Sequence, residues 1–293
     1  MKPALFDPQF LRRLESLEIV SRKIFTGKMR GEKRSRRKGF SQEFADYRDY
    51  VPGDDLRFLD WNVYGRLDKL FLRLFYEEED LHVHVLLDAS RSMDSGDPDK
   101  FGYARRLAGA IGYVALSNLN PLTVHILRKE KPEKLPTLRG KKSVWRLLDF
   151  LEKQEARGET DLAGSLRRFA LERPRRGVAI LISDFLSREG PEAALKWLMA
   201  SGMEAHVLHV LSPQELDPEI RGDFKLMDME DADLVEISLT GTLIKSYQRT
   251  LGAFRTALAR DCARHRAAYT FASTATPFED LVLLYLRKAG LVG

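Results

Sequence analysis

Five side chains that carry oxygen donors occur in a spacing that could bind a hard metal ion. Three of them, Asp88, Ser90 and Ser92, form an Asp-x-Ser-x-Ser motif directly after the apolar run 81–87. An apolar run that stops at an acidic residue before a helix start is typical of a buried parallel strand that ends at a site. A carboxylate and two hydroxyls on one tight loop are ligands that a magnesium-like ion prefers. The same residues could also form an ordinary strand-to-helix turn that satisfies backbone amides.

Two further positions strengthen the metal interpretation. Asp184 follows a second apolar run, 177–183, and Thr160 stands just before a predicted helix. Since the carboxyl ends of parallel strands meet at one edge of an open α/β sheet, these side chains should lie near the first three. An octahedral Mg2+ shell would leave one position for an acidic group from a partner. The predicted ligands of Mg2+, with Mn2+ or Ca2+ as alternatives, are Asp88, Ser90, Ser92, Thr160 and Asp184.

The chain from Leu81 onward alternates short apolar runs with stretches of helical periodicity. This alternation is the pattern of a parallel sheet covered by helices on both faces. Strands are predicted at 81–87, 122–127, 177–183, 205–211, 234–239 and 269–272. Helices are predicted at 97–115 with Asp97 as its cap, 144–151, 162–169, 191–198, 247–258 and from Pro277. We therefore predict an α/β domain over residues 81–293, with a doubly wound, mostly parallel sheet of the Rossmann-like type.

The first 80 residues differ in composition and form an N-terminal extension. Apolar side chains at helical spacing predict an amphipathic helix over 8–20. A basic arm, residues 22–38, follows, and a stretch dense in aromatic and charged side chains continues from Phe40. This stretch is too polar for a core of its own and too aromatic for a linker. We therefore predict that the extension, residues 1–80, packs on the domain that follows.

The basic arm concentrates the positive charge of the chain. It holds nine Lys or Arg residues against one acid, Glu32, and so carries +8, whereas the whole chain carries +5 and the remainder therefore −3. Such a run could bind phosphates or an anionic membrane surface, dock on an acidic partner, or form a solvated loop. No aromatic residue lies between Lys28 and Lys38, which argues against a surface for stacking nucleic-acid bases. We do not expect nucleic acid as the partner.

The composition is that of a globular protein. Of 293 residues, 44% are hydrophobic and 31% are charged, and no apolar stretch is long enough to cross a bilayer. Charged side chains interrupt the first 20 residues where a signal peptide would need an apolar centre. The single cysteine, Cys262, cannot form an internal disulfide. We therefore predict a cytoplasmic protein without a membrane span.

The five predicted ligands resemble the metal-ion-dependent adhesion site of von Willebrand factor A-type domains. The pattern of that site is Asp-x-Ser-x-Ser, a later Thr and a later Asp, and all five positions are filled here. The resemblance implies a metal-dependent protein-binding domain, in which an acidic residue of the partner completes the metal shell.

The N-terminal half resembles the bacterial family known as domain of unknown function 58. The similar pattern is Arg48-x-Tyr50-x-Pro52-Gly53-Asp54-Asp55-x-Arg57-x-x-Asp60-Trp61, followed by Arg66 and Arg73. This resemblance implies a MoxR-type AAA+ ATPase as the partner, with the pair acting in chaperone-like maturation or remodelling of other proteins. The chain departs from the family in two ways. Many relatives carry N-terminal membrane-spanning helices, and Glu159 stands where a double glycine is usual, so that it could crowd the site.

Other chemistries fit the motifs less well. Asp88 could be the nucleophile of a haloacid-dehalogenase-like phosphatase, which also uses an Asp after a strand together with magnesium. Those enzymes place a second Asp two residues on, where this chain has Ser90, whose hydroxyl has no useful pKa for acid and base catalysis. The histidines lack the spacing of a zinc site, and no glycine-rich phosphate loop occurs. We favour a non-enzymatic binding protein, with the phosphatase, or nucleic-acid or anionic-surface binding through the basic arm, as alternatives.

Overall fold

The computed structural model divides into two compact units, Met1–Arg22 with Leu81–Gly293, and Lys23–Asp80. The first residues of the predicted extension therefore group with the larger unit. The basic arm and Thr160 lie outside the described residues, and the packing of the aromatic stretch on the following domain stays a prediction. The structure describes residues 6, 8–14, 17, 19, 44–75, 81–129, 132–159, 161–187, 190–218, 222–227, 234–239, 241–285 and 287.

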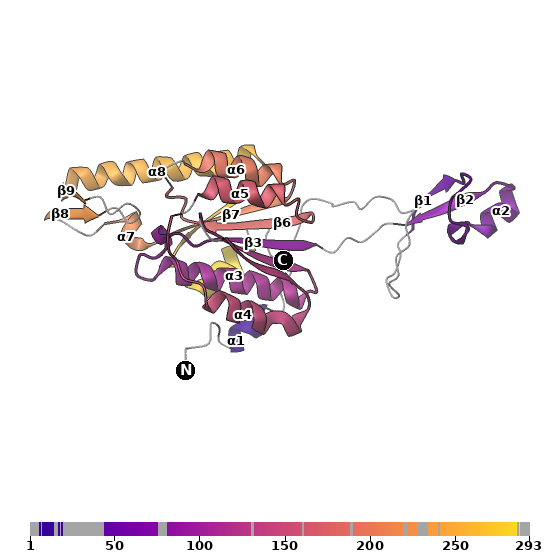
Figure 1. Ribbon diagram of the computed structural model, residues 1–293, viewed down its shortest axis with the longest axis horizontal. Coiled ribbons are helices and arrows are strands. Elements are labelled where there is room, and N and C mark those ends of the chain that lie inside the picture. The colour runs from indigo at the N-terminus through magenta and orange to yellow at the C-terminus, as the bar shows by residue number, and fades with distance from the viewer. Residues whose placement is uncertain are drawn as a thin grey trace. The chain divides into compact units, whose positions relative to one another are not determined.

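Six strands form the sheet of the larger unit (Figure 1). They are β3 (His82–Asp88), β4 (Leu122–Leu127), β5 (Glu133–Leu138), β6 (Gly177–Ser183), β7 (Glu204–Leu211) and β10 (Ala268–Ser273). Their order is β10-β7-β6-β3-β4-β5, and all neighbours are parallel except β4 and β5. The strands β3, β4, β6 and β7 are buried along their whole length, as central strands covered on both faces should be. The predicted fold class, doubly wound and mostly parallel, is confirmed.

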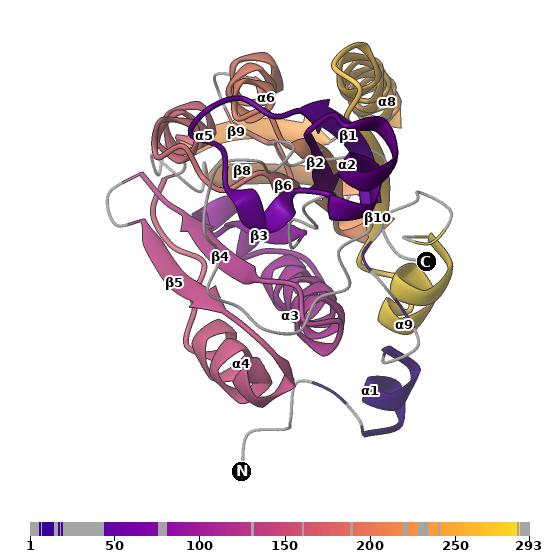
Figure 2. The ribbon, with the colours of Figure 1, turned by 90° about the vertical axis from the view of Figure 1, so that its right-hand side faces the viewer.

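Helices cover both faces of this sheet (Figure 2). The main ones are α3 (Lys100–Ser117), α4 (Val144–Glu152), α5 (Leu162–Leu171), α6 (Pro191–Ala200) and α8 (Gly241–Arg264). The helices α3 and α4 lie on one face, and α5, α6 and α8 lie on the other. Each face has its own core because alternate strand residues point to opposite sides: Val85 and Leu87 join the first core, and Leu86 joins the second. Both faces are thereby filled, which leaves the carboxyl ends of the strands as the edge where a site can form.

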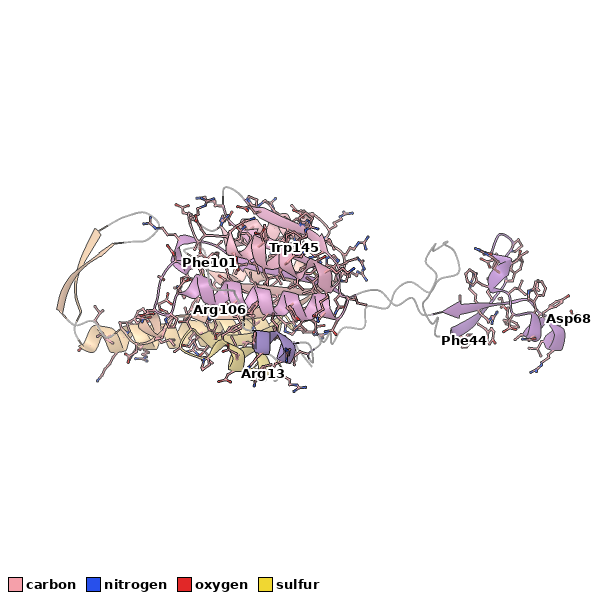
Figure 3. The ribbon with its side chains drawn as sticks, turned by 90° about the horizontal axis from the view of Figure 1, so that it is seen from below. Arg13, Phe44, Asp68, Phe101, Arg106 and Trp145 are labelled. Carbon is pink, nitrogen blue, oxygen red and sulfur yellow. The ribbon has the colours of Figure 1, made fainter. Side chains whose placement is uncertain are left out.

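Aromatic side chains fix the N-terminal helix to the end of the described chain. The elements concerned are α1 (Pro8–Leu14), α9 (Phe278–Asp280) and the π-helical turn Leu281–Tyr285. The ring centroid of Phe278 lies 5.0 Å from that of Phe10 and 5.8 Å from that of Phe6. The guanidinium of Arg106 on α3, which Figure 3 labels, lies 5.6 Å from the same Phe278 ring. Such aromatic pairs contribute about 0.5–1.5 kcal/mol beyond the area they bury, so α1 is part of this core.

Two predictions about element bounds are wrong, and one strand was not predicted. The helix predicted over 8–20 ends at Leu14. The helix α3 begins at Lys100 because the carboxylate of Asp99, and not that of Asp97, accepts the first free amides of the helix. The strand β5 was not expected, since it is half-exposed, contains Pro136 and pairs only with β4 at the edge of the sheet, where proline is tolerated.

The smaller unit contains a two-stranded antiparallel sheet and a short helix. Its described elements are β1 (Phe44–Asp49), a 3-10 turn (Leu56–Phe58), α2 (Trp61–Leu67) and β2 (Phe71–Phe75). Asp60 caps α2 by accepting the amides of Asn62 and Val63, and it also accepts a bond from the Tyr47 hydroxyl at 3.1 Å. Arg73 of β2 lies 3.8 Å from the same carboxylate. The bonds to the Asp60 carboxylate, that from the Val63 amide above all, lower its pKa. Asp60 and Arg73 of the motif thus tie α2 to the sheet.

The remaining described elements lie between β7 and α8. They are α7 (Pro213–Leu216), β8 (Gly222–Met227) and β9 (Leu234–Leu239). The strand predicted at 234–239 is confirmed, but it pairs with β8 in a separate antiparallel sheet rather than with the main sheet. Among the helices of the described residues, none combines the length and the apolar character needed to cross a membrane.

Two buried histidines lie side by side on the sheet, beneath α5. The rings of His84 and His125 have centroids 6.1 Å apart, and both contact the ring of Phe169 edge to face. Burial disfavours the charged imidazolium and lowers the pKa of His84 to about 4 and that of His125 to about 3. Both rings are therefore neutral in the folded protein at neutral pH.

We expect the free energy of unfolding to fall by about 1.6 kcal/mol per histidine between pH 6.5 and pH 5. The unfolded chain takes up protons below about pH 6.5, whereas the folded rings stay neutral. The stability is thus fully present above pH 6.5 and is lost as the pH falls toward the folded pKa values. Guanidinium unfolding at several pH values measures the slope. His125→Gln, which cannot take up a proton, should show a shallower fall, and a fall of unchanged size would assign the effect to other groups.

Candidate metal site

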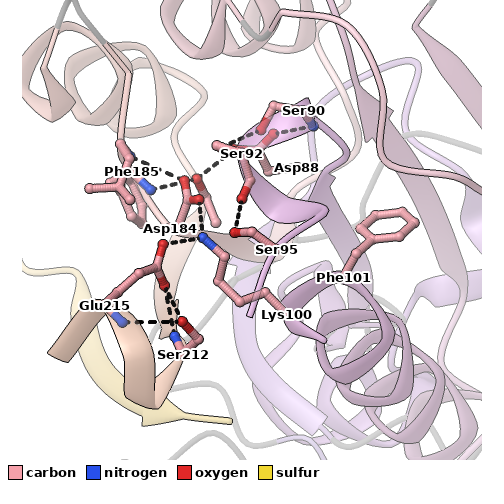
Figure 4. A network of polar contacts seen from close by, with 12 residues as sticks. Asp88, Ser90, Ser92, Ser95, Lys100, Phe101, Asp184, Phe185, Ser212 and Glu215 are labelled. Carbon is pink, nitrogen blue, oxygen red and sulfur yellow. Dashed lines mark hydrogen bonds and ion pairs between the residues drawn. The ribbon is translucent and has the colours of Figure 1, made fainter. Parts of the chain in front are cut away.

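The predicted motif forms a loop at the carboxyl end of β3, here called the site loop (residues 88–92; Figure 4), which is buried at residues 88–90 and partly buried at Ser92. The Asp88 carboxylate accepts hydrogen bonds from the backbone amide of Ser90 at 3.0 Å and from the hydroxyl of Ser183 at 2.6 Å. The hydroxyl oxygens of Ser90 and Ser92 share a hydrogen bond of 3.0 Å. Asp88 and Ser90 are only 3% and 2% exposed. The structure therefore brings three of the five predicted ligands together.

Backbone bonds hold the site loop against the segment that precedes Thr160. The amide of Arg91 donates to the carbonyl of Gly158 at 2.8 Å, and the amide of Arg157 donates to the carbonyl of Ala89 at 3.0 Å. Gly158 has a φ of +72°, a conformation that glycine adopts without cost. Thr160 itself lies outside the described residues, so its role as a ligand stays a prediction.

Glu159, which departs from the family pattern, does not turn toward the site loop. Its carboxylate pairs with the ammonium of Lys129, and its side chain is 41% exposed. Its backbone carbonyl also accepts a bond from the amide of Lys129 at 3.2 Å. The crowding that the sequence suggested is therefore not seen, because Lys129, two residues beyond the end of β4, pairs with Glu159.

Asp184 lies at the end of β6, the strand next to β3. It is 1% exposed, and one oxygen of its carboxylate accepts a bond from the amide of Leu186 at 3.1 Å. The other oxygen accepts a bond from the ammonium of Lys100 at 2.8 Å. Ser183, which directly precedes Asp184, is the residue that donates to Asp88. The two strand-terminal carboxylates are therefore connected through one serine.

A lysine that sequence reasoning missed lies at the centre of this network (Figure 4). The side chain of Lys100 is fully buried, and its ammonium contacts Glu215 at 2.5 Å as well as Asp184. Burial acts to lower the pKa of Lys100, but Asp184 and then Glu215 outweigh it, so the pKa is raised. Lys100 is thus a fixed positive charge between two carboxylates.

Glu215 reaches this network from a third strand end, that of β7. Its carboxylate accepts the amide of Ser212 at 2.8 Å, and the Ser212 hydroxyl accepts the amide of Glu215 at 3.3 Å, which forms a capping box on α7. Gly96, at φ +90°, packs so closely on Ser212 that a Cβ would lie 2.4 Å from the serine Cβ. Gln214 exchanges two hydrogen bonds with the backbone of Asp97. The ends of β3, β6 and β7 are therefore joined around Lys100.

Two sequence signals pointed to the missed residues. Lys100 is the first residue of α3, where the positive end of the helix dipole disfavours a cation, so its presence there calls for an acidic partner. Ser212 and Glu215 have the spacing of a capping box. Neither signal identifies the pairing, because 84 and 115 positions separate Lys100 from Asp184 and Glu215.

The donor set of the site loop suits a hard cation. Asp88, Ser90 and Ser92 offer carboxylate and hydroxyl oxygens, the ligands that Mg2+ prefers. Within the described ranges, no group of three or more His, Cys, Asp or Glu side chains is placed to hold a metal, so binding here would depend on the serine hydroxyls. Asp184 differs from the other predicted ligands, since its carboxylate already pairs with an internal cation.

The solved structures that are similar to this chain include the following two. An aerotolerance-related membrane protein from Bacteroides fragilis NCTC 9343 shares 17% sequence identity, over 71% of this chain and 99% of that chain, with a TM-score of 0.44. The von Willebrand A domain of SpRpn10 shares 10% identity, over 70% of this chain and 94% of that chain, with a TM-score of 0.42. Likeness at this level says nothing about what this chain binds.

Sequence comparison is more informative about family. The uncharacterized protein Rv1480 of Mycobacterium tuberculosis (strain ATCC 25618 / H37Rv) is 29% identical over 266 residues, which span 87% of this chain and 81% of that protein. The model of the family described as "Protein of unknown function DUF58" matches residues 46–261. The match includes the whole motif in the smaller unit and the whole region from β3 to β7. The chain therefore belongs to the DUF58 family.

Proposed function

We propose that the chain is a non-enzymatic adaptor, which binds a protein partner through a metal-dependent site at the carboxyl edge of its sheet. The observation that carries the proposal is that the side chains of Asp88, Ser90 and Ser92 lie together in one loop, with Asp88 and Ser90 buried. These three side chains would bind Mg2+, with Mn2+ or Ca2+ as alternatives, and Thr160 and Asp184 would be the other ligands. When bound, the metal would supply a positive centre to which an acidic side chain of the partner can bind.

The same loop argues against a magnesium-dependent phosphatase with Asp88 as its nucleophile. The position of the second acid is Ser90, whose hydroxyl is bonded to that of Ser92. The other carboxylates that the described residues bring to this network, Asp184 and Glu215, both hold Lys100. A general acid and base must contact the reacting group, whereas both of these carboxylates contact a buried ammonium.

We propose a MoxR-type AAA+ ATPase as the partner, by the resemblance of the chain to its family. The chain has no glycine-rich phosphate loop of its own, so a partner would have to supply the nucleotide hydrolysis that remodelling needs. The pair would act, in the cytoplasm, in the maturation or remodelling of other proteins.

We expect Asp88→Asn to abolish capture of a MoxR-type ATPase from the same genome on the immobilised full chain in Mg2+. The amide keeps the shape and can still accept from Ser183, but it removes the charge that attracts the cation. The same substitution should weaken Mg2+ or Mn2+ binding, measured by isothermal titration, by about tenfold to a hundredfold. Chelator should reproduce the loss of capture on the unmodified chain.

Asp94→Asn is the matched control, because Asp94 is exposed and lies two residues beyond the site loop. It should leave both capture and metal binding unchanged. Capture that survives both Asp88→Asn and chelator would refute the adaptor proposal. Hydrolysis of a generic phosphate ester in Mg2+, lost in Asp88→Asn, would instead support the phosphatase.

A further inference from the structure

We propose that Lys100 is an internal cation of the metal site, which keeps the edge of the sheet assembled without metal and sets the affinity for divalent cations. This inference rests on the proposed metal site, but not on the identity of the partner. It concerns a residue outside the predicted ligands, which pairs with one of them.

The position of Lys100 supports this role. Its side chain is fully buried, and the only partners that the described contacts give its ammonium are Asp184 and Glu215. A buried ammonium is stable only when it is paired in this way. Asp184 follows the serine that donates to Asp88, so the ammonium is separated from the site loop by a single carboxylate and its neighbouring hydroxyl.

The loop geometry makes the position of the ammonium fixed rather than adjustable. The amide of Lys100 donates to the carbonyl of Ser95 at 3.1 Å, and the hydroxyl of Ser95 donates to the carbonyl of Ser92 at 2.8 Å. On the other side, the capping box with Ser212 holds Glu215. The lysine is thus anchored to the site loop at one end and to α7 at the other.

Electrostatics give the direction of the effect. A positive charge at this range repels a divalent cation, and it also uses a carboxylate that would otherwise attract the metal. In the unmodified chain the charges of Lys100, Asp184 and Glu215 sum to −1, whereas Lys100→Met leaves −2 and Glu215→Gln leaves 0. Metal affinity should therefore rise in the first variant and fall in the second.

Isothermal titration of MnCl2 into the purified full chain and its variants tests this inference. Lys100→Met should bind Mn2+ at least about tenfold more tightly than the unmodified chain. Glu215→Gln should bind Mn2+ at least about threefold less tightly. Mg2+ should raise the thermal unfolding midpoint of Lys100→Met by more than that of the unmodified chain, because the metal replaces the lost charge. Glutamine keeps the capping box of α7, so Glu215→Gln should remain folded.

Lys153→Met is the control, because Lys153 pairs with Asp149 on the surface of α4, and it should leave the affinity for Mn2+ unchanged.

A purely structural lysine would give weaker or unchanged binding in both variants, which would overturn the inference. If Lys100→Met does not fold, Lys100→Met/Glu215→Gln is compared with Glu215→Gln, since the two differ only in the lysine charge: tighter Mn2+ binding by the double variant supports the inference, and equal or weaker binding overturns it. If no variant and no unmodified chain binds Mn2+, both the inference and the proposed metal site fall. If the Mn2+ affinities of the variants follow the expected order but capture of the ATPase does not depend on metal, only the adaptor proposal is refuted.

Discussion

Lys100→Met is expected to lower the free energy of unfolding by about 3–5 kcal/mol in the absence of divalent cations. The substitution removes the ammonium but leaves the buried Asp184 and the partly buried Glu215 close together without a cation. Removing one member of a buried ion pair costs far more than the pair contributes, because the remaining charge has lost its solvent and its partner. Chemical denaturation followed by circular dichroism measures the change.

Lys153→Met is the control, because it makes the same substitution at an exposed lysine. Lys153 and Asp149 are 69% and 52% exposed, and such pairs on a helix surface contribute at most about 0.5 kcal/mol. Lys100→Met/Glu215→Gln should recover part of the loss, since it removes one of the two remaining charges. Equal stability of Lys100→Met and Lys153→Met would mean that water reaches the network and screens it.

Phe10→Ala is expected to lower the free energy of unfolding by about 3–5 kcal/mol. The Phe10 ring is 4% exposed and contacts both Phe6 and Phe278. Its loss leaves a cavity between α1 and α9 and ends the edge-to-face contact with Phe278. Guanidinium unfolding of the full chain measures the effect.

Trp145→Ala is the control for loss of an aromatic side chain. Trp145 lies on the outer side of α4 and is 67% exposed (Figure 3), so its removal should change stability by no more than about 0.5 kcal/mol. A similarly small effect of Phe10→Ala would mean that α1 packs only loosely on the rest of the unit.

The central strands could be predicted from sequence because burial on both faces leaves a clear signature. The apolar runs that end at Asp88 and Asp184 are the buried strands β3 and β6. An acidic residue at the end of such a run indicates a site or a turn. The edge strand β5 could not be found in this way. It has one exposed edge and only two buried residues, Leu135 and Leu138, so it lacks the periodic pattern of a strand.

The charge network was beyond the reach of sequence for a different reason. Asp88, Ser90 and Ser92 are neighbours in the chain, so their meeting follows from local spacing. The pairing of Lys100 with Asp184 and Glu215 depends on the lateral order of β3, β6 and β7. Each of these residues has a local sequence signal, but their contact with one another follows only from the order of the strands.

The contact between α1 and α9 also constrains the order in which the chain can fold. Phe10 meets Phe278 across nearly the whole length of the chain, so this contact cannot form until the intervening sheet has brought the two segments together. Contacts between residues so distant in sequence carry a cost in loop entropy and slow the folding of the domains that depend on them. Docking of α1 should therefore be a late event, and protection of its amides against hydrogen exchange should appear only after the amides of β3 and β6 are protected.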